Sequence, residues 1–284
     1  MLGHGGPSFC RAVAWHFKPP SSHRWFQLNA ALRGDRMKAW PRRRHSMRPV
    51  HVVALGGSLL RPEEANARTM WMGQLRQLMV HLEGNDRRIG LVVGGGLPAR
   101  NGIQLASETV QDPHRLDEVG IAATRLNATI LQQVMLDIGC DVASVVPHTI
   151  DHARQLLDQH HIVVMGGTVP GQTTDTVAVK LAAAVHARHC IIATNVSHVH
   201  NKDPRQHEDA VAFTEMTLDE LGGIVGVGKP LNPGDSAVVD PIAVSVAIDA
   251  GLDLAVLDGR DIGRLDKALD GALFEGTLVR ARGD

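Results

Sequence analysis

The sequence predicts an α/β protein, a three-layer αβα sandwich in which a mostly parallel central sheet lies between two layers of helices. From about residue 49 onward, short apolar segments alternate with longer segments whose apolar residues recur at helical spacing. The short segments are apolar at consecutive positions, which is typical of strands covered on both faces. This alternation of strands and helices is the pattern of a parallel sheet with helical crossovers.

The first predicted strand ends at Gly56 and Gly57, where the chain turns into a helix, and the second ends in a run of three glycines. A long helix is then expected because its apolar residues recur at three- and four-residue spacing. In order, this part of the chain is expected to contain strands at residues 50–55, 89–93 and 142–146, and helices at residues 64–82, 98–109 and 117–137.

The same alternation continues to the end of the chain, with no internal repeat and no low-complexity segment. The remaining predicted strands are residues 162–165, 190–193, 254–257 and 276–279. The remaining predicted helices are residues 148–158, 174–187, 218–225, 240–250 and 262–269.

Residues 1–48 differ from the rest of the chain. They contain ten lysines and arginines against one acid, Asp35, and they hold three of the four tryptophans. Such a segment is typical of a transit peptide or of a nucleic-acid-binding arm. The alternative that we favour is that native translation starts at Met47, directly before the first strand. The predicted domains are therefore a basic extension, 1–48, and a folded domain, 49–284.

The bulk composition excludes several classes of protein. The net charge is −1, so no global field favours binding to nucleic acid or to an anionic membrane surface. No apolar run approaches the roughly 18 residues that a membrane-spanning helix needs. The three cysteines are far apart and lack CxxC spacing, which argues against a disulfide framework or a cysteine zinc site. We expect a cytoplasmic protein with no nucleic acid or membrane partner.

Three predicted strand ends are rich in glycine and hydroxyl groups: residues 56–58, 94–96 and 166–174. In open α/β sheets, ligands bind beyond the carboxyl ends of the strands. Glycines let the backbone come close to a ligand, and amide groups next to a helix N-terminus form an anion cradle. One such turn is a weak signal, but three together predict a cleft for several phosphate groups. The chain has neither GxxxxGK[ST] nor GxGxxG, which disfavours a P-loop kinase and a dinucleotide fold.

Five motifs, in order and at matching spacing, resemble those of archaeal-type UMP kinases in the amino-acid-kinase family. They are GGGLPAR (94–100), DEVGIAATRLNA (117–128), MGGTVPGQTTD (165–175), ATNV with KDP (193–196 and 202–204) and PGDSAVVDPIA (233–243). The similarity covers roughly residues 50–279. The resemblance implies the amino-acid-kinase fold, with an acceptor-binding part at about 49–187 and an ATP-binding part at about 188–284.

The resemblance also implies transfer of the γ-phosphoryl group of ATP to UMP, in pyrimidine nucleotide biosynthesis, with Mg²⁺ carried by ATP. The implied UMP-binding residues are Gly95, Asp117, Thr168, Val169, Pro170, Gly171, Gln172, Thr173 and Thr174. The implied ATP-binding residues are Gly57, Ser58, Gly96, Arg100, Thr194, Asn195, His200 and Asp203. Arg100 and Asp175 are the implied catalytic residues, and Arg125 and Asn127 are implied to support the acceptor site from their helix. The family commonly forms homo-hexamers.

Two departures from the family pattern affect this interpretation. Ala54 stands where many kinases of this fold have a lysine, so another cation must reach the phosphates; Lys202 and Lys229 are candidates, and each could equally be a solvated surface residue. After Asn195, the family's aromatic residue is missing, and His200 is a possible replacement in the adenine contact.

Alternative functions stay open at this point. An isopentenyl phosphate kinase has the same fold but typically carries a histidine in its glycine turn, where this chain has Pro98 and Ala99. A pseudokinase, or a non-catalytic relative that stores metal-oxide clusters, is the alternative outside enzymes. The sixteen histidines do not complete a recognisable zinc site, so no dedicated metal site is expected.

Overall fold

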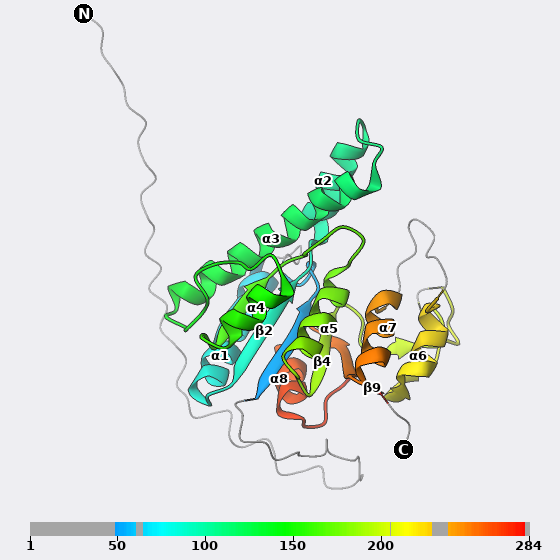
Figure 1. Ribbon diagram of the computed structural model, residues 1–284. Helices are drawn as coiled ribbons and strands as arrows, with labels where there is room; N and C mark the ends of the chain where they lie inside the picture. Colours follow the sequence, from blue (N-terminus) through cyan, green and yellow to red (C-terminus); the bar gives the residue numbers. More distant parts are fainter. Residues whose placement is uncertain (1–48, 61–64, 205, 229–237, 282–284) are drawn as a thin grey trace, which may run out of the picture. The chain divides into compact units, whose positions relative to one another are not determined.

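The computed structural model describes residues 49–60, 65–204, 206–228 and 238–281, and the statements below concern these residues (Figure 1). The basic extension predicted at 1–48 and the candidate cation Lys229 lie outside them.

A seven-stranded sheet forms the centre of the described part, in the order β3-β2-β1-β4-β8-β9-β7. Its strands are β1 (Val50–Leu55), β2 (Arg88–Val93), β3 (Ile162–Met165), β4 (His189–Thr194), β7 (Glu215–Thr217), β8 (Asp253–Asp258) and β9 (Thr277–Arg280). The five strands from β3 to β8 are all parallel, whereas β9 is antiparallel to β8 and parallel to β7. The prediction of a mostly parallel sheet is confirmed.

Helices cover both faces of this sheet (Figure 1). The helices are α1 (Ala65–Gly84), α2 (Gly96–Ser107), α3 (Pro113–Asp137), α4 (Ile150–Leu157), α5 (Thr174–Ala184), α6 (Leu218–Val225), α7 (Pro241–Ala250) and α8 (Ile262–Asp270). One buried core lies between the sheet and α1, α3 and α8, and the other lies between the sheet and α4, α5, α6 and α7. Successive β1 residues enter opposite cores: Val52 and Ala54 join the second, and Val53 and Leu55 join the first. Coverage on both faces is therefore why consecutive central positions of the strands, such as residues 52–55 of β1, are apolar.

Side-chain caps fix where most of these helices begin. A hydroxyl or carboxylate before the first turn accepts a backbone N–H that has no partner inside the helix. The capping residues are Asp112, Thr149, Thr173, Thr217, Asp240 and Asp261, for α3 to α8 in order. The Asp112 cap explains why α3 begins at Pro113, earlier than the predicted residue 117.

The predicted strand at 142–146 is wrong. Only Val142 pairs with β3, through an isolated bridge to Ile162. The carbonyl of Ala143 accepts a hydrogen bond from the buried side chain of Gln132, on α3, at 2.8 Å, and Val145 is exposed. Because this side chain takes the carbonyl that would continue the ladder, the chain leaves the sheet edge.

Three short strands were not predicted. The pair β5 (Val199–His200) and β6 (Ala212–Phe213) forms a separate antiparallel hairpin, and β7 joins the edge of the main sheet beside β9. Strands of two or three residues are too short to show a hydrophobic period.

Helices α2 and α3 extend together beyond the sheet (Figure 1). They pack closely because Gly102 faces Val119 and Gly120 faces Ile103.

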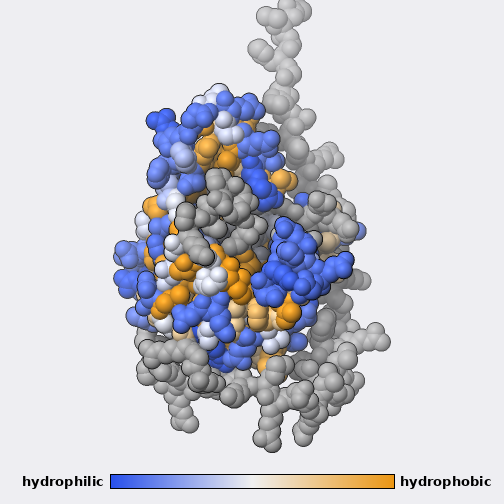
Figure 2. Space-filling model, turned by 90° about the vertical axis from the view of Figure 1, so that its right-hand side faces the viewer, coloured by the Kyte–Doolittle hydropathy of each residue, from blue (hydrophilic) through white to orange (hydrophobic). Residues whose placement is uncertain are grey.

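On the face seen in Figure 2, hydrophilic residues predominate and hydrophobic residues form scattered patches. No helix in the described ranges has the length and apolar character needed to cross a membrane.

Candidate functional site at the carboxyl edge of the sheet

The turns after β1 and β2 touch each other at the carboxyl edge of the sheet. A Cβ atom on Gly57 would lie 2.3 Å from the Gly96 nitrogen and 2.5 Å from the Gly94 oxygen. Gly96 has φ +57°, and a Cβ atom there would meet the Gly57 carbonyl at 2.6 Å. Only glycine allows this backbone approach. The two glycine turns predicted to lie near phosphates therefore form one continuous surface of backbone groups.

Asn127, from α3, holds the second glycine turn in place. Its side-chain amide is fully buried and donates to the carbonyls of Gly94, at 2.8 Å, and Gly95, at 3.0 Å. Because α3 binds these two carbonyls, it supports the glycine turn that forms part of the proposed ligand surface. The sequence assigned Asn127 a supporting role, and the contacts are of that kind.

The loop after β3, residues 166–174, is fixed to α3 by three side chains, and we call it the acceptor loop. The Thr124 hydroxyl accepts the Gly167 N–H at 2.7 Å. Arg125 donates to the carbonyls of Gly167 and Thr168, each at 3.2 Å. Asp117 accepts the Gly171 N–H at 2.7 Å. Asp117, expected at the ribose, thus lies beside the loop expected to hold the acceptor phosphate.

The end of the acceptor loop is bound to the other half of the molecule through Asp240. One carboxylate oxygen of Asp240, which precedes α7, accepts the hydroxyls of Thr173 at 2.5 Å and Thr176 at 2.6 Å. The other oxygen accepts the Ile242 N–H at 3.0 Å. Asp240 is buried, 8% exposed, so these contacts replace water around its carboxylate.

Asp175, expected to be catalytic, lies half-buried in the first turn of α5. Burial removes water from its carboxylate and the Asp240 carboxylate repels its charge, and together these raise the pKa of Asp175 to about 6. A hydrogen bond from the Asp240 backbone opposes this rise. The thiol of Cys190, on β4, lies close enough for the Asp175 charge to raise its pKa, although burial raises it more. Asp175 therefore titrates close to neutral pH.

The turns after β4 and β8 adjoin the first glycine turn from its other side. Gly56 donates to the Ala193 carbonyl at 2.9 Å, and Gly259 donates to the Thr194 carbonyl at 2.8 Å. The buried indole of Trp71, on α1, donates to the Gly259 carbonyl at 2.7 Å. Thr194, expected at the ATP site, thus belongs to the same edge as the glycine turns.

Arg260 lies beside Asn195, at the end of the sheet edge where the ATP site is expected. It binds Asp258 through its guanidinium and donates to the Asn195 carbonyl at 3.2 Å. The Arg260 side chain is 66% exposed. Its guanidinium lies next to Asn195, another residue expected at the ATP site, with its charge paired to Asp258.

Other predicted residues are not joined to this cluster. Lys202 pairs with Asp209 at 2.6 Å, which commits its charge to a surface ion pair. His200 lies near the His198 carbonyl, at 3.0 Å, and Asp203 accepts from Gln206 at 3.4 Å. No hydrogen bond or ion pair among the described residues connects His200 to the glycine turns. The expected adenine contact of His200 stays a prediction.

Five predicted polar ligand-binding side chains have no hydrogen-bond or ion-pair partner among the described residues: Ser58, Arg100 on α2, Thr168 and Gln172 in the acceptor loop, and Thr174 at the start of α5. The first backbone N–H groups of α5 follow Thr173, and a helix N-terminus favours an anion. The arrangement offers hydroxyls, amides and one arginine to phosphate groups.

No group of three or more His, Cys, Asp or Glu within the described ranges is arranged to hold a metal ion.

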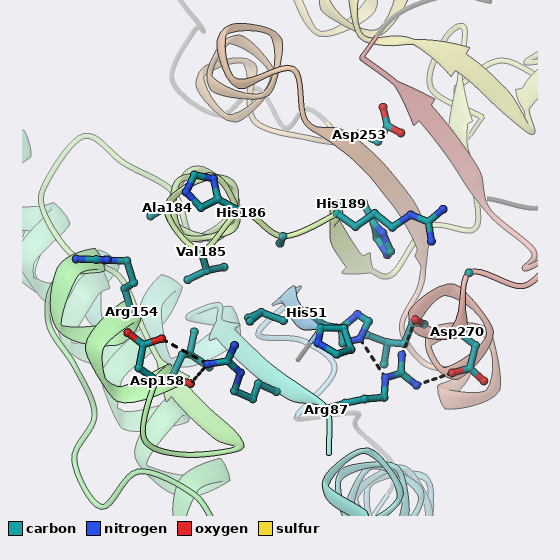
Figure 3. A pocket seen from close by; sticks show the side chains of 18 of the residues that line it. His51, Arg87, Arg154, Asp158, Ala184, Val185, His186, His189, Asp253 and Asp270 are labelled. Atoms are coloured by element: carbon teal, nitrogen blue, oxygen red, sulfur yellow. Dashed lines mark hydrogen bonds and ion pairs between the residues drawn. The ribbon is translucent and has the colours of Figure 1, made fainter. Parts of the chain in front are cut away.

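A cavity of about 1130 Å³ lies at the opposite, amino edge of the sheet, where Pro49, Arg88, His189 and Asp253 precede or begin β1, β2, β4 and β8 (Figure 3). Of the four arginines that line it, Arg87 and Arg88 bind the ends of helices. Arg87 donates to the Leu269 carbonyl, pairs with Asp270 and donates to His51.

Arg88 donates to the Leu157 carbonyl at 2.9 Å, so it caps the end of α4 as Arg87 caps the end of α8. Burial, and then Arg87, lower the pKa of His51 to about 3, which keeps this imidazole neutral. Arg87 and Arg88 therefore have a structural role in this cavity, and the helix C-termini that they bind, which carry partial negative charge, do not favour an anion.

Sequence reasoning missed three side chains that shape the carboxyl edge: Asp240, Trp71 and Arg260. Asp240 stands at the start of the helix predicted at 240–250 and within the motif at 233–243, but no role was assigned to its side chain. The contacts of Trp71 and Arg260 join positions far apart in the sequence, and no local pattern marks them.

The comparisons with known proteins agree with this geometry. The model of the amino acid kinase family matches residues 49–258. A uridylate kinase of Methanococcus maripaludis strain C7 is 39% identical over 208 residues, which cover 73% of this chain and 90% of the relative. A uridylate kinase of Methanocaldococcus jannaschii is 35% identical over 228 residues, covering 79% of this chain and 99% of the relative. The crystal structure of uridylate kinase from Archaeoglobus fulgidus superposes with a TM-score of 0.69 at 32% identity, covering 81% of this chain and 99% of that one.

Proposed function

The chain belongs to the amino acid kinase family, and from this premise we propose that it is a uridylate kinase that transfers the γ-phosphoryl group of ATP to UMP. One structural observation carries the proposal: the glycine turns after β1 and β2 pack into one backbone surface beside the acceptor loop and the N-terminus of α5. Two phosphorylated ligands that meet at this edge would have their phosphates next to one another.

The proposed acceptor site is the loop at residues 166–174 together with Gly95 and Asp117. The Thr168 and Thr174 hydroxyls and the first amides of α5 are proposed to bind the UMP phosphate. Asp117 is proposed to bind the ribose, and Val169, Pro170 and Gln172 to border the base. The Arg125 and Thr124 contacts support this site because they fix the loop to α3 before any ligand arrives.

The proposed donor site lies across the glycine turns, from Gly57, Ser58 and Gly96 to Thr194 and Asn195. Arg260 is a further cation at this end, which the sequence did not identify. Because the lysine expected at position 54 is absent, Arg100 and Arg260 are the described arginines proposed to offset the charge of the ATP phosphates.

Phosphoryl transfer requires alignment and charge stabilisation more than covalent help from the protein. The phosphate of UMP is itself a nucleophile at neutral pH. The backbone amides of the glycine turns and Arg100 would stabilise the charge on the equatorial oxygens of the group in transfer. Asp175, with a pKa near 6, would be ionised above that pH and would orient donor groups around the reacting phosphates.

Mg²⁺ is proposed to enter with ATP and to neutralise phosphate charge. Such an ion takes most of its ligands from phosphates and water and needs at most one or two protein carboxylates. The phosphates of ATP would supply the protein-independent part of this coordination, so no side chain of the described residues is assigned to the ion. Homo-hexamer formation and a cytoplasmic location stay predictions.

An ADP-release assay on the full chain tests the proposal, with Mg-ATP and UMP, CMP, dUMP or isopentenyl phosphate as the acceptor. We expect strong preference for UMP, with product UDP confirmed by chromatography. Preference for isopentenyl phosphate would reassign the acceptor. Folded protein that is inactive with all four acceptors would contradict the kinase assignment and favour a non-catalytic relative.

A further inference from the structure

We propose that Asp240 is a positioning residue for phosphoryl transfer, which joins the acceptor loop to the half of the molecule that binds ATP. The inference rests on the proposed function, because it assigns a role within the same site. Asp240 contacts two residues of the proposed site: its carboxylate accepts the Thr173 hydroxyl, and its backbone N–H donates to Asp175. Its effect on the reaction would therefore pass through the loop and through Asp175.

The contacts of Asp240 use the whole carboxylate. One oxygen accepts two hydroxyl groups, from Thr173 at 2.5 Å and from Thr176 at 2.6 Å, and the other accepts the N–H of Ile242. Thr176 is fully buried, and Asp240 is 8% exposed. Hydrogen bonds to a buried charged acceptor are among the stronger ones in proteins. The junction between α5 and α7 is thus fixed by a charged group at its centre.

The contacts at this junction determine which hydrogen bonds the Thr173 hydroxyl can make. Its hydroxyl gives its one proton to Asp240 and accepts the Thr176 N–H at 3.3 Å. Thr173 therefore has no proton left for a phosphate oxygen. The sequence expected Thr173 to bind UMP directly, but the contacts assign it to holding the loop, which leaves Thr168 and Thr174 as the hydroxyl donors.

Asp240 differs from the other side chains that hold the acceptor loop. Thr124, Arg125 and Asp117 all come from α3, in the acceptor-binding part of the chain. Asp240 comes from the part after residue 188 and holds Thr173, the residue before α5. It therefore links the loop by side-chain hydrogen bonds to the ATP-binding part, and in-line transfer requires that these two parts keep a fixed relative position.

Asp240 also affects the pKa of Asp175, which directly precedes Thr176 in the chain. Burial is the main cause of the raised pKa of Asp175, and the Asp240 charge is the second. The groups that face Asp175 from neighbouring elements are Asp240, before α7, and the Cys190 thiol on β4, whose pKa is also raised. Loss of the Asp240 charge should therefore lower the pKa of Asp175.

Steady-state kinetics of the full chain test the positioning role, with Asp240→Asn and Thr176→Val. Both variants lose hydroxyl contacts at the junction, but Thr176→Val keeps the charge. We expect the KM for UMP to rise on the order of tenfold in Asp240→Asn and a few-fold in Thr176→Val. The KM for ATP should stay within about twofold, since the glycine turns do not depend on Asp240.

The matched control is Asp112→Asn. Asp112 caps α3, is followed by proline and accepts the N–H two residues on, as Asp240 does for α7. It lies outside the proposed site, so its KM values should match those of the wild type. Equal changes in both KM values for Asp240→Asn, or the same changes in Asp112→Asn, would overturn the proposal. If Asp240→Asn does not fold, Thr176→Val decides by the same criterion.

A second measurement does not need turnover. The melting temperatures of the wild type, Asp175→Asn, Asp240→Asn and the double variant form a cycle that isolates the pair. At pH 7.5, Asp175→Asn should raise the melting temperature by about 2 °C more when Asp240 is present than when it is replaced. At pH 4.5, where Asp175 is protonated, this difference should shrink. An equal effect in both backgrounds at pH 7.5 would contradict the electrostatic pairing.

The kinetics and the melting cycle together distinguish a failure of the proposed function from a failure of the proposed role of Asp240. A wild type that transfers nothing to UMP would overturn the proposed function, and the melting cycle would still decide whether Asp240 acts on Asp175. A wild type active on UMP, with unchanged KM for UMP in both junction variants, would overturn the role of Asp240 alone.

Discussion

Single polar side chains hold the backbone of the proposed site in place. Asn127 bonds two carbonyls of the second glycine turn, and Thr124 accepts an amide of the acceptor loop. Both are buried side chains of α3. Glycine makes the close approach of backbone to ligand possible, but it contributes no side-chain contact that would fix the turn. The buried amide and hydroxyl supply that support.

Arg100 is the side chain for which a direct role in transfer is proposed. It lies one turn into α2, exposed, and has no side-chain partner among the described residues. We expect Arg100→Ala to lower kcat by well over tenfold, a magnitude scaled from the loss of single donors that stabilise developing charge. Initial rates with saturating UMP and Mg-ATP measure this effect.

The control for Arg100 is Arg115→Ala, on α3 of the same helical pair. The Arg115 side chain is 79% exposed and lies 3.6 Å from Asp112. Its loss should leave kcat within about twofold, since exposed ion pairs contribute little. Unchanged kcat in Arg100→Ala would remove that residue from the mechanism.

At the scale of elements, a histidine joins two connections at the amino edge of the sheet. His161, directly before β3, lies 2.9 Å from Asp141 and 3.2 Å from Asp86 through its two ring nitrogens. Its hydrogen bonds to Asp141 and then to Asp86 raise the pKa of His161, and burial opposes them. Both ring nitrogens donate only when the imidazole is protonated. The bridge from His161 thus holds the α1–β2 and α3–α4 connections together in the charged state.

This bridge makes stability depend on pH. A group whose pKa is raised on folding stabilises the folded state fully below its unfolded pKa, near 6.5, and loses that contribution as pH rises through the folded value. We expect His161→Gln to lower the free energy of unfolding by about 1 kcal/mol at pH 6 and by less at pH 9. Urea unfolding at the two pH values measures the difference.

The exposed His148 provides the comparison, because it has no hydrogen-bond or ion-pair partner among the described residues. His148→Gln should change the free energy of unfolding little at either pH. A loss in His161→Gln that is the same at pH 6 and pH 9 would mean that the bridge does not depend on protonation.

At the scale of the whole molecule, α1 is connected to the proposed donor site through Trp71. The indole donates to the Gly259 carbonyl, and the Gly259 N–H donates to the Thr194 carbonyl. A ligand at Thr194 and Asn195 would therefore disturb the environment of this buried ring. The other three tryptophans, at positions 15, 25 and 40, precede the described part of the chain.

Tryptophan fluorescence can locate the donor site. In a full chain with Trp15, Trp25 and Trp40 replaced by phenylalanine, we expect Mg-ATP to change the emission of Trp71 in a saturable way. UMP alone should have a smaller effect, because the acceptor loop lies on the other side of the glycine turns.

The complementary variant, Trp71→Phe with the other tryptophans kept, should lose the response to Mg-ATP. A response of Trp71 to UMP but not to Mg-ATP would place the donor site elsewhere than at the ends of β4 and β8.

The sequence by itself determined the fold class and the edge of the sheet at which the proposed site lies. Strands such as β1 are apolar at consecutive positions, His51 excepted, because both faces are covered, and this property is visible without the structure. The glycine turns are equally local, since a strand, two or three glycines and a helix follow one another directly in the chain. The family could be identified because its motifs keep this local order.

Only the tertiary structure decided which of these turns touch and which side chains join them. The contacts of Asp240 with Thr173, and of Trp71 with Gly259, connect residues 67 and 188 positions apart. The same holds for the failed strand at 142–146, where the side chain of Gln132 takes a carbonyl that the pattern assigned to a ladder. Periodicity reports which face of an element is buried, because it depends on neighbouring residues alone. It does not report which distant partner covers that face, since that depends on how the whole chain packs.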